Sequence, residues 1–348
     1  MMLKKNHKIS LDKFINFCLY DKKNGYYMKK NPFGKTGDFT TAPNISRLFS
    51  EMIAVWTISY WQMLGSPKKF NLIELGAGNG EMMKMMIESF KKFPTFHNSC
   101  SIIIYEKSPS LIKIQKNKIK GKNVKWIPSL KKLNDFPSIF LANEFFDAIA
   151  IRQFLKEKDN WFERFVHISN TKNASFFNKK INIKSIEKKL NFNISYNQNF
   201  VEYSPLGFKY IKNIVKLIEK NDGGLLIIDY GYNKEKMKDT LQGISNKKYS
   251  NILENIGNSD ITYNINFNII KKFIQTFKKM NINITTQKNF LLNMGIIKRA
   301  EIISKNKTFT EKADIYYRLK RLIDEKEMGD LFKVMLITKI NNNFQIGF

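Results

Sequence analysis

The sequence of 348 residues contains only two cysteines and three histidines. Cys18 and Cys100 stand in unrelated contexts, which excludes a disulfide framework and a CxxC metal or redox site. His7, His97 and His167 are scattered, so we expect no metal centre. No apolar run approaches the roughly 18 residues that a membrane-spanning helix needs, and no apolar segment follows the basic start MMLKKNHKIS. We therefore expect a soluble, cytoplasmic protein that does not insert into a membrane.

Arginine is also scarce, although the net charge is +29. Base-reading and phosphate-binding sites favour the planar guanidinium group, whereas here lysines spread among Asn and Ile supply most of the charge. We interpret the excess as a solvated lysine-rich surface and leave a dedicated nucleic-acid surface as the less favoured alternative. A cationic ligand would be repelled at long range and would need local carboxylates to hold it. The arginines are Arg47, Arg152, Arg164, Arg299, Arg318 and Arg321.

From Phe70 onward, short apolar runs alternate with segments of helical periodicity. This alternation predicts βαβ units and an α/β fold with a mostly parallel, doubly wound sheet. The predicted strands are 70–75, 101–106, 124–127, 138–144, 225–231 and 331–340. The predicted helices in this part of the chain are 81–93, 108–119, 204–221, about 267–280 and 311–327.

Two departures from this alternation suggest a domain organisation. Residues 1–66 predict an N-terminal helical arm, with helices at 11–20 and 44–65 around a loop rich in Gly, Pro and Thr. Residues 67–340 predict the core domain, with insertions at about 151–200 and 232–265. The first insertion begins with IRQFLKE, the turn KDN and WFERFVHI, which is typical of a β-hairpin.

The string IELGAGNGEMM places Gly76, Gly78 and Gly80 in a tight turn between a predicted strand and a predicted helix. Glycines there let the backbone turn sharply and approach a ligand. The spacing is GxGxG, which differs from the GxGxxG of a dinucleotide site and from a P-loop. With Glu74 just before the turn, the pattern predicts S-adenosyl-L-methionine, which has no phosphate to bind but needs acids for its ammonium and ribose groups.

The next predicted strand, SIIIYE, ends in Glu106. A carboxylate at that position accepts the hydroxyl groups of a ribose in dinucleotide folds, and we predict the same contact here. A surface glutamate at a strand end is the alternative role for Glu106. Since NAD also carries ribose, a nicotinamide oxidoreductase stays open as an alternative at this point.

Several longer strings together resemble the MidA-like family of S-adenosylmethionine-dependent methyltransferases. They are KTGDFTTAPNISRLFSEMI, ELGAGNG, ANEFFDAIAIRQF, IIDYG, DTLQG and DEKEMGDLFKVM, and they follow one another over roughly residues 10 to 340. Mitochondrial members of that family serve as assembly factors for respiratory complex I and are regarded as protein arginine methyltransferases. The resemblance therefore implies a class I, Rossmann-like methyltransferase fold and S-adenosyl-L-methionine as the cofactor.

The resemblance also implies cofactor contacts at the glycine turn and Glu106, and a functional role for residues 143–147, where we assign Asn143 to the cofactor. The chain departs from the family pattern at three places. Asn44 stands where the family usually has Glu after TAP, and Pro128 or Ser129 stands where it has an acid. The family string TAHVDF appears as TYNINF at 262–267, which lacks the His and the Asp, so we assign no catalytic histidine.

Glu144 ends the fourth predicted strand, on the sheet edge where ligands of α/β folds bind. We predict that Glu144 holds and polarises a guanidinium acceptor, that Asp147 assists as a second catalytic carboxylate, and that Phe145 or Phe146 lines its path by cation–π contact. The alternatives are that both rings belong to the core, that Asp147 is structural, and that Glu144 is a structural strand end. Asp229, at the end of another predicted strand, is a further candidate on the acceptor side.

The loop between the two N-terminal helices contains Gly37, Asp38, Phe39, Thr40 and Thr41. Long loops of this kind often cover a site, and we predict a lid over cofactor and acceptor. A structural loop that ties the arm to the sheet is the alternative.

The function predicted from these observations is methyl transfer from S-adenosyl-L-methionine to an arginine side chain of a protein, with a complex I subunit implied by the resemblance alone. Two alternatives remain: an RNA or small-molecule methyltransferase on the same fold, and a non-catalytic assembly factor that retains the cofactor pocket. Neither the acceptor protein nor the oligomeric state follows from the sequence.

Overall fold

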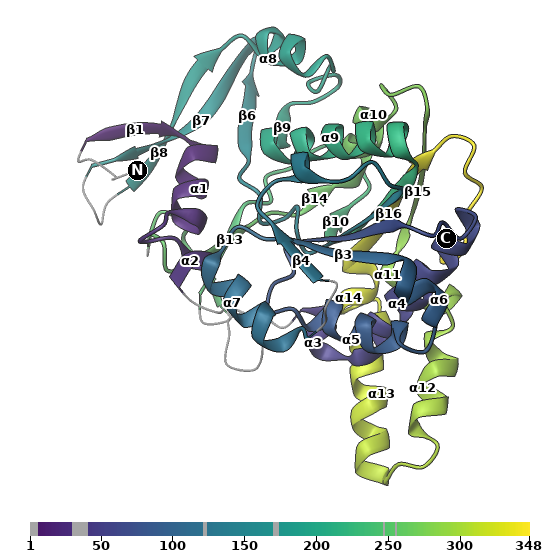
Figure 1. Cartoon of the computed structure of the whole chain (residues 1–348). Coiled ribbons are helices and arrows are strands. Elements are labelled where there is room, and N and C mark those ends of the chain that lie inside the picture. Colours follow the sequence, from purple (N-terminus) through teal and green to yellow (C-terminus); the bar gives the residue numbers. More distant parts are fainter. Residues whose placement is uncertain (1–5, 30–40, 121–123, 170–173, 246–247, 255) are drawn as a thin grey trace. The chain divides into compact units, whose positions relative to one another are not determined.

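The chain forms two compact units, each assembled from separate stretches of sequence (Figure 1). The first unit comprises 1–30, 146–213 and 231–278, and the second comprises 31–145, 214–230 and 279–348. The predicted N-terminal arm, residues 1–66, contributes to both units, and its boundary stays a prediction. The computed structural model describes residues 6–29, 41–120, 124–169, 174–245, 248–254 and 256–348.

The second unit contains a sheet with the strand order β15-β16-β10-β5-β2-β3-β4. Strands β10, β5, β2, β3 and β4 are parallel, whereas β16 is antiparallel to both of its neighbours. The carboxyl ends of the parallel strands therefore meet at one edge, and the chain order reverses at β2, which is where ligands bind in such sheets. The bounds are β2 (Phe70–Leu75), β3 (Cys100–Tyr105), β4 (Val124–Ile127), β5 (Ser138–Asn143), β10 (Gly223–Tyr232), β15 (Met280–Thr286) and β16 (Phe332–Lys339).

The helices of the second unit include the long α4 and the helix that follows the glycine turn, α5. Ser46 caps α4 by accepting a hydrogen bond from the Leu48 N–H at 3.2 Å, which satisfies one of the unpaired amides of the first turn. The bounds are α3 (Ala42–Ile45), α4 (Arg47–Met63), α5 (Glu81–Phe90), α6 (Pro94–Ser99), α7 (Pro109–Lys118), η1 (Leu130–Lys132), α11 (Gln287–Asn293), α12 (Ile296–Ser304), α13 (Phe309–Ile323) and α14 (Met328–Leu331), with the second part of α9 (Pro205–Asn221).

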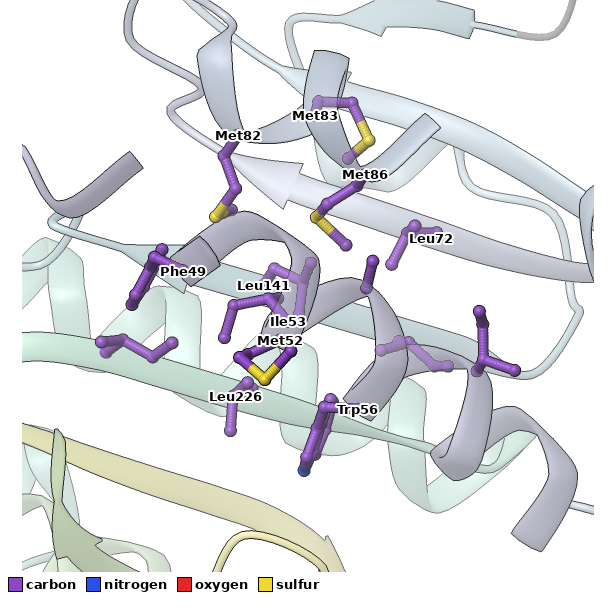
Figure 2. Packing of buried hydrophobic residues seen from close by; sticks show 14 of the residues in the cluster. Phe49, Met52, Ile53, Trp56, Leu72, Met82, Met83, Met86, Leu141 and Leu226 are labelled. Carbon is purple, nitrogen blue, oxygen red and sulfur yellow. The ribbon is translucent and has the colours of Figure 1, made fainter. Parts of the chain in front are cut away.

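A core of buried apolar side chains joins α4 and α5 to one face of this sheet (Figure 2). Burial of each such side chain contributes roughly 1.5–3 kcal/mol, and the methionines fill irregular gaps because their side chains are flexible. The sheet is thereby fixed, so its strand ends can position polar groups. The labelled side chains are Phe49, Met52, Ile53 and Trp56 of α4, Met82, Met83 and Met86 of α5, and Leu72, Leu141 and Leu226 of the strands.

The first unit contains a sheet with the strand order β1-β7-β6-β9, with β8 also paired to β7, and a small sheet β12-β11-β13. Strands β6 and β7 form the predicted hairpin, in which Arg152 binds the buried Glu163 at 2.6 Å. The bounds are β1 (His7–Ser10), β6 (Arg152–Glu157), β7 (Asn160–Ile168), β8 (Ala174–Ile181), β9 (Phe200–Tyr203), β11 (Gln242–Ser245), β12 (Lys248–Ser250), β13 (Asp260–Thr262), β14 (Ile265–Asn266), α1 (Leu11–Tyr20), α2 (Tyr26–Lys29), α8 (Ile183–Leu190) and α10 (Phe267–Ile274), with the first part of α9.

The predicted strands and helices of the βαβ alternation are confirmed, with shifts of a few residues at their ends. The predicted helix 267–280 is too long, because α10 ends at Ile274 and β15 begins at Met280. Elements β8, α8, β15, α11 and α12 were not predicted. No helix of the described residues is both long enough and apolar enough to cross a membrane.

Candidate active site

The glycine turn lies where β2 ends and α5 begins. Gly76, Gly78 and Gly80 all have positive φ, at 67°, 52° and 78°, a conformation that side chains disfavour. The Gly76 N–H donates to the carbonyl of Tyr105 at 2.9 Å, which ties the turn to the end of β3. A Cβ on Gly76 would lie 2.8 Å from Cδ2 of Phe145. The backbone of this turn therefore depends on glycine both for its conformation and for its close approach to the Phe145 ring.

Glu74 lies near the end of β2, two residues before Gly76, and is buried with 3% of its surface exposed. Its Oε2 atom has no hydrogen-bond partner among the described residues. Burial, reinforced by the charge of Glu106, raises the pKa of Glu74 to about 8. A buried carboxyl oxygen without a partner is costly unless a ligand supplies one, so Oε2 of Glu74 could accept a hydrogen bond from a cationic ligand.

Glu106 follows β3 directly and is held by its own loop. Its Oε1 accepts the N–H groups of Lys107 and Ser108 at 2.8 and 2.9 Å, and its Oε2 accepts Nε2 of Gln115 at 3.1 Å. Burial raises the pKa of Glu106, and these hydrogen bonds oppose that rise because they favour the charged form. The carboxylate is therefore fixed in orientation before any ligand arrives.

Gln115 of α7 connects Glu106 to the glycine turn. Its Nε2 also donates to the carbonyl of Gly78 at 2.9 Å, and its Oε1 accepts Nε1–H of Trp126 from β4 at 2.9 Å. The side chain is fully buried. Gln115 was not predicted, because the sequence alone does not show that this position of α7 faces the glycine turn and β4.

Glu144 follows β5 directly and adopts a left-handed backbone with φ of 47°, which is uncommon for a residue with a side chain and frequent at functional sites. Its N–H donates to the carbonyl of Ile228 at 2.9 Å, which holds it against β10. Its Oε1 accepts the Ala42 N–H at 3.4 Å and Nδ2 of Asn143 at 3.3 Å. The carboxylate is thus held by Ala42 and Asn143, and the backbone of Glu144 is held by β10, all within the second unit.

Asn143, at the end of β5, holds Glu144 by its amide nitrogen while its buried Oδ1 has no hydrogen-bond partner among the described residues. Asn143 pairs with Ile228 across the parallel strands β5 and β10. Asp229 comes next on β10, is fully buried, and accepts the Tyr230 N–H at 3.0 Å on its Oδ1. The sheet register therefore brings Asp229 to the same edge as Glu144, as expected.

Residues 41–45 form the segment next to Glu144. Asn44, which stands at a position where the family pattern has Glu, donates Nδ2–H to Oγ1 of Thr41 at 2.7 Å and accepts Nδ2–H of Asn79 on its Oδ1 at 2.9 Å. Asn79 belongs to the glycine turn, and its Oδ1 accepts the N–H of Glu81 at 3.2 Å. The departure at Asn44 thus forms a direct link between this segment and the turn.

The two phenylalanines differ in their surroundings. Phe145 is half-buried, with its ring edge-on to Tyr105 at 6.3 Å between centroids and packed against Gly76. Phe146 is buried at 2% exposure and belongs to the first unit, as does Asp147, which is 6% exposed. Phe145 is therefore part of the site edge, whereas the predicted roles of Phe146 and Asp147 stay predictions.

The predicted lid residues Gly37, Asp38, Phe39 and Thr40 lie outside the described residues. Within the part of the chain that the structure describes, no group of three or more His, Cys, Asp or Glu side chains could hold a metal ion. Glu74, Gly76, Gly78, Gly80, Glu106, Asn143, Glu144, Phe145 and Asp229 are all brought to the carboxyl edge of the sheet in the second unit.

Comparisons with known proteins identify the family to which the sequence is similar. Residues 52–285 match the family described as "Putative S-adenosyl-L-methionine-dependent methyltransferase". The chain is 29% identical over 370 residues to "Protein arginine methyltransferase NDUFAF7, mitochondrial" of Xenopus tropicalis, covering 95% of this chain and 82% of that protein. The human protein of the same name is 27% identical over 368 residues, with 95% and 80% covered.

Among solved structures, a Burkholderia thailandensis protein bound to S-adenosyl-homocysteine matches with a TM-score of 0.81 and 21% identity. The match covers 98% of this chain and 90% of that chain. At this identity the likeness establishes a shared fold, and it confirms the predicted Rossmann-like architecture.

The curated relatives from frog, human and worm are named as mitochondrial proteins. This finding contradicts the cytoplasmic location predicted from the sequence. The predicted cytoplasmic location is wrong. It was inferred from the lack of an apolar targeting segment, and the lack of one kind of targeting segment does not determine the compartment.

Proposed function

Because this chain belongs to the family of S-adenosyl-L-methionine-dependent methyltransferases, we propose that it transfers the methyl group to an arginine side chain of a protein. The family membership confirms the resemblance and the cofactor predicted from the motifs. Support for arginine as the acceptor comes from the relatives, which are named protein arginine methyltransferases. Support also comes from the carboxylates at the sheet edge, since an arginine side chain needs acids to hold it.

The residues present fit S-adenosyl-L-methionine, which supplies an electrophilic methyl group on a sulfonium when bound. Gly76, Gly78 and Gly80 add no side chains of their own to the turn, and Glu74 has a buried oxygen without a partner among the described residues. We assign Glu106 to the ribose hydroxyls, because its carboxylate is already oriented by three donors, and Glu74 to the ammonium. Asn143 has a buried Oδ1 that can accept one further hydrogen bond on the same side.

The observation that carries the acceptor assignment is Glu144. Its carboxylate is held at the carboxyl edge of the sheet by Ala42 and Asn143 and rests on a left-handed backbone. A guanidinium stays protonated because its pKa lies above about 12, so it binds a carboxylate by charge-assisted, bidentate hydrogen bonds. Glu144 then orients one guanidinium nitrogen by accepting a hydrogen bond from its N–H. As that nitrogen gains the methyl group, its proton passes to the Glu144 carboxylate.

Other groups at this edge would support the same step. Asp229 adds a second carboxylate on the neighbouring strand, and Phe145 offers a half-buried ring to the flat face of a guanidinium. Asp147 and Phe146 remain proposed contributors, as does the loop 37–40 as a cover that excludes water. Positioning of this kind can lower a barrier by about 7–11 kcal/mol at best.

The protein substrate proposed from the sequence resemblance is a subunit of respiratory complex I. The test is labelled-methyl transfer into a lysate depleted of endogenous enzyme, followed by acid hydrolysis and separation of the labelled amino acids. Label in methylarginine is the expected result. Label that disappears on ribonuclease treatment would instead assign an RNA acceptor, and no protein or RNA label with intact cofactor binding would favour a non-catalytic assembly factor.

A further inference from the structure

A cavity of about 630 Å³ lies within the first unit, and none of its lining residues belongs to the proposed active site. Its volume falls in the range of about 300–1,000 Å³ that is usual for ligand sites. Its lining comes from the hairpin β6–β7, the end of β8, the start of α8, the loop 195–199 and Lys236. Nothing in the proposed methyl transfer uses these residues.

The floor of the cavity is a row of side chains across three strands. Lys156 of β6 is directly opposite Trp161 of β7, and Trp161 is directly opposite Ile181 of β8. Directly opposed residues of antiparallel strands project to the same face. A lysine, a half-buried indole ring and an isoleucine therefore lie side by side on this face.

The walls of the cavity are held by hydrogen bonds. Gln198 donates Nε2–H to the carbonyl of Glu235 and accepts the Met237 N–H, both at 2.9 Å, which ties the loop 195–199 to residues 235–237. Glu187 of α8 accepts the N–H and the hydroxyl of Ser195 at 2.9 and 2.7 Å. The cavity is therefore built by fixed contacts between α8, the loop and the segment that carries Lys236.

The cavity lining carries three lysines, Lys156, Lys184 and Lys236, against one acid, Asp159. Lys184 binds Glu187 at 3.1 Å, and the nearby Glu235 binds Lys272 at 3.2 Å. Lys236 donates only to the carbonyl and Oδ1 of Asn197, and Lys156 has no ion pair among the described residues. Two uncompensated lysines thus face the cavity.

The remaining lining groups suit a peptide better than a nucleic acid. Asn160 and Asn199 offer amide groups that can donate to and accept from a peptide backbone, and Trp161 offers a surface for an apolar side chain. Nucleic-acid sites favour arginine and several stacking rings. Among the described residues, the lining includes no arginine and one aromatic ring, that of Trp161.

We propose that this cavity binds an acidic peptide segment of the protein substrate. The inference rests on the proposed function, because a protein acceptor is what gives such a contact a purpose. With a net charge of +29, the protein repels the arginine of its substrate at long range, and a substrate with an acidic segment would offset that repulsion by binding here. The substrate class is therefore an acidic protein that exposes an arginine.

The test measures binding of fluorescein-labelled deca-glutamate by fluorescence anisotropy. The wild-type protein should bind it with an affinity that falls as salt rises. The double substitution Lys156→Glu with Lys236→Glu should weaken binding by about tenfold, since it reverses two exposed charges. Lys209→Glu with Lys212→Glu on α9, two exposed lysines outside the cavity, makes the same change in net charge and should alter binding less than about twofold.

Equal weakening in both double variants would overturn the proposal, since only the overall field would then matter. Tighter binding of labelled deca-uridylate, lost in the cavity variant alone, would also overturn it in favour of nucleic acid. Glu144→Gln should bind deca-glutamate normally, so failure of methyl transfer and failure of this cavity can be told apart. If the cavity variant loses deca-glutamate but labels lysate protein at the wild-type rate, the cavity does not hold the substrate.

Discussion

The cofactor side and the acceptor side of the proposed site are stabilised differently. On the cofactor side, Glu106 is satisfied by neighbours nearby in sequence, and Gln115 joins it to the glycine turn. On the acceptor side, Glu144 is held by Ala42 and Ile228, which are distant in sequence, and its backbone is strained. Because the two sides depend on different contacts, we expect a substitution on one side to change methyl transfer without changing cofactor affinity, and a substitution on the other side to change cofactor affinity.

Glu144→Gln should have the largest effect. The neutral amide keeps the shape of the side chain but removes the charge that would hold the guanidinium, so we expect kcat to fall by about a hundredfold or more. Affinity for S-adenosylhomocysteine, measured by calorimetry, should stay within about twofold of the wild type. Asp135→Asn, which changes an exposed carboxylate paired with Lys220 in the same unit, is the matched control. Wild-type turnover in Glu144→Gln would remove Glu144 from the mechanism.

Gly76→Ala tests the cofactor side. The new Cβ would meet the Phe145 ring at 2.8 Å in a backbone with φ of 67°, and strain of about 2 kcal/mol corresponds to a loss of roughly thirtyfold in affinity for S-adenosylhomocysteine. Gly65→Ala is the control, because Gly65 also has a positive φ but no atom within 4 Å. That variant should lose stability and keep its cofactor affinity. Equal cofactor affinity in both variants would contradict the role of the turn.

Gln115→Met should have a smaller effect on the same side. Methionine keeps the length of the side chain but leaves Glu106 and the Gly78 carbonyl without one donor each, so affinity for S-adenosylhomocysteine should fall about tenfold. Gln62→Met, at an exposed position of α4, should change nothing in the same titration. An unchanged affinity in Gln115→Met would mean that Glu106 is oriented by its backbone donors alone.

A change of pH should alter the affinity for S-adenosylhomocysteine least of all these changes. Because the pKa of Glu74 is raised to about 8, the free protein holds a proton there at lower pH, and an ammonium ligand must displace it. Affinity for S-adenosylhomocysteine should therefore rise several-fold between about pH 6 and pH 8, with proton release detected by calorimetry in two buffers. Glu74→Gln should abolish both the slope and the proton release, and an unchanged slope would assign it to another group.

The raised pKa of Glu74 also makes the free energy of unfolding depend on pH. A carboxyl whose pKa is higher in the folded protein than in the unfolded chain favours folding in its protonated form. The contribution of Glu74 to stability should therefore be fully present below its unfolded pKa and should be lost as the pH rises to about 8.

The sequence predicted those parts of the site whose structure is determined by residues close together in the chain. The glycine turn and the strand ends at Glu106 and Glu144 follow from local patterns of strand, turn and helix. Gln115 was missed because its partners belong to the turn and to β4, and a single sequence does not show which helix residue faces them. The link between Asn44 and Asn79 was missed for the same reason.

The division of the chain into two interleaved units was also not predictable from local patterns, because each unit is assembled from segments far apart in sequence. The elements β8, α8 and α11 are only seven or eight residues long, and helices and strands of this length depend on tertiary contacts. Lys156 falls in the predicted β-hairpin and Lys236 in the second predicted insertion, and the sequence did not show that the two lie at one cavity.

The most direct test of the central claim is a crystal structure with S-adenosylhomocysteine bound. The account predicts that the ribose hydroxyls lie within hydrogen-bond distance of the Glu106 carboxylate, that the amino group meets Glu74, and that the Glu144 carboxylate faces the homocysteine sulfur across an open space for the acceptor. A ligand bound away from the glycine turn, or a Glu144 carboxylate that contacts the cofactor itself, would contradict it.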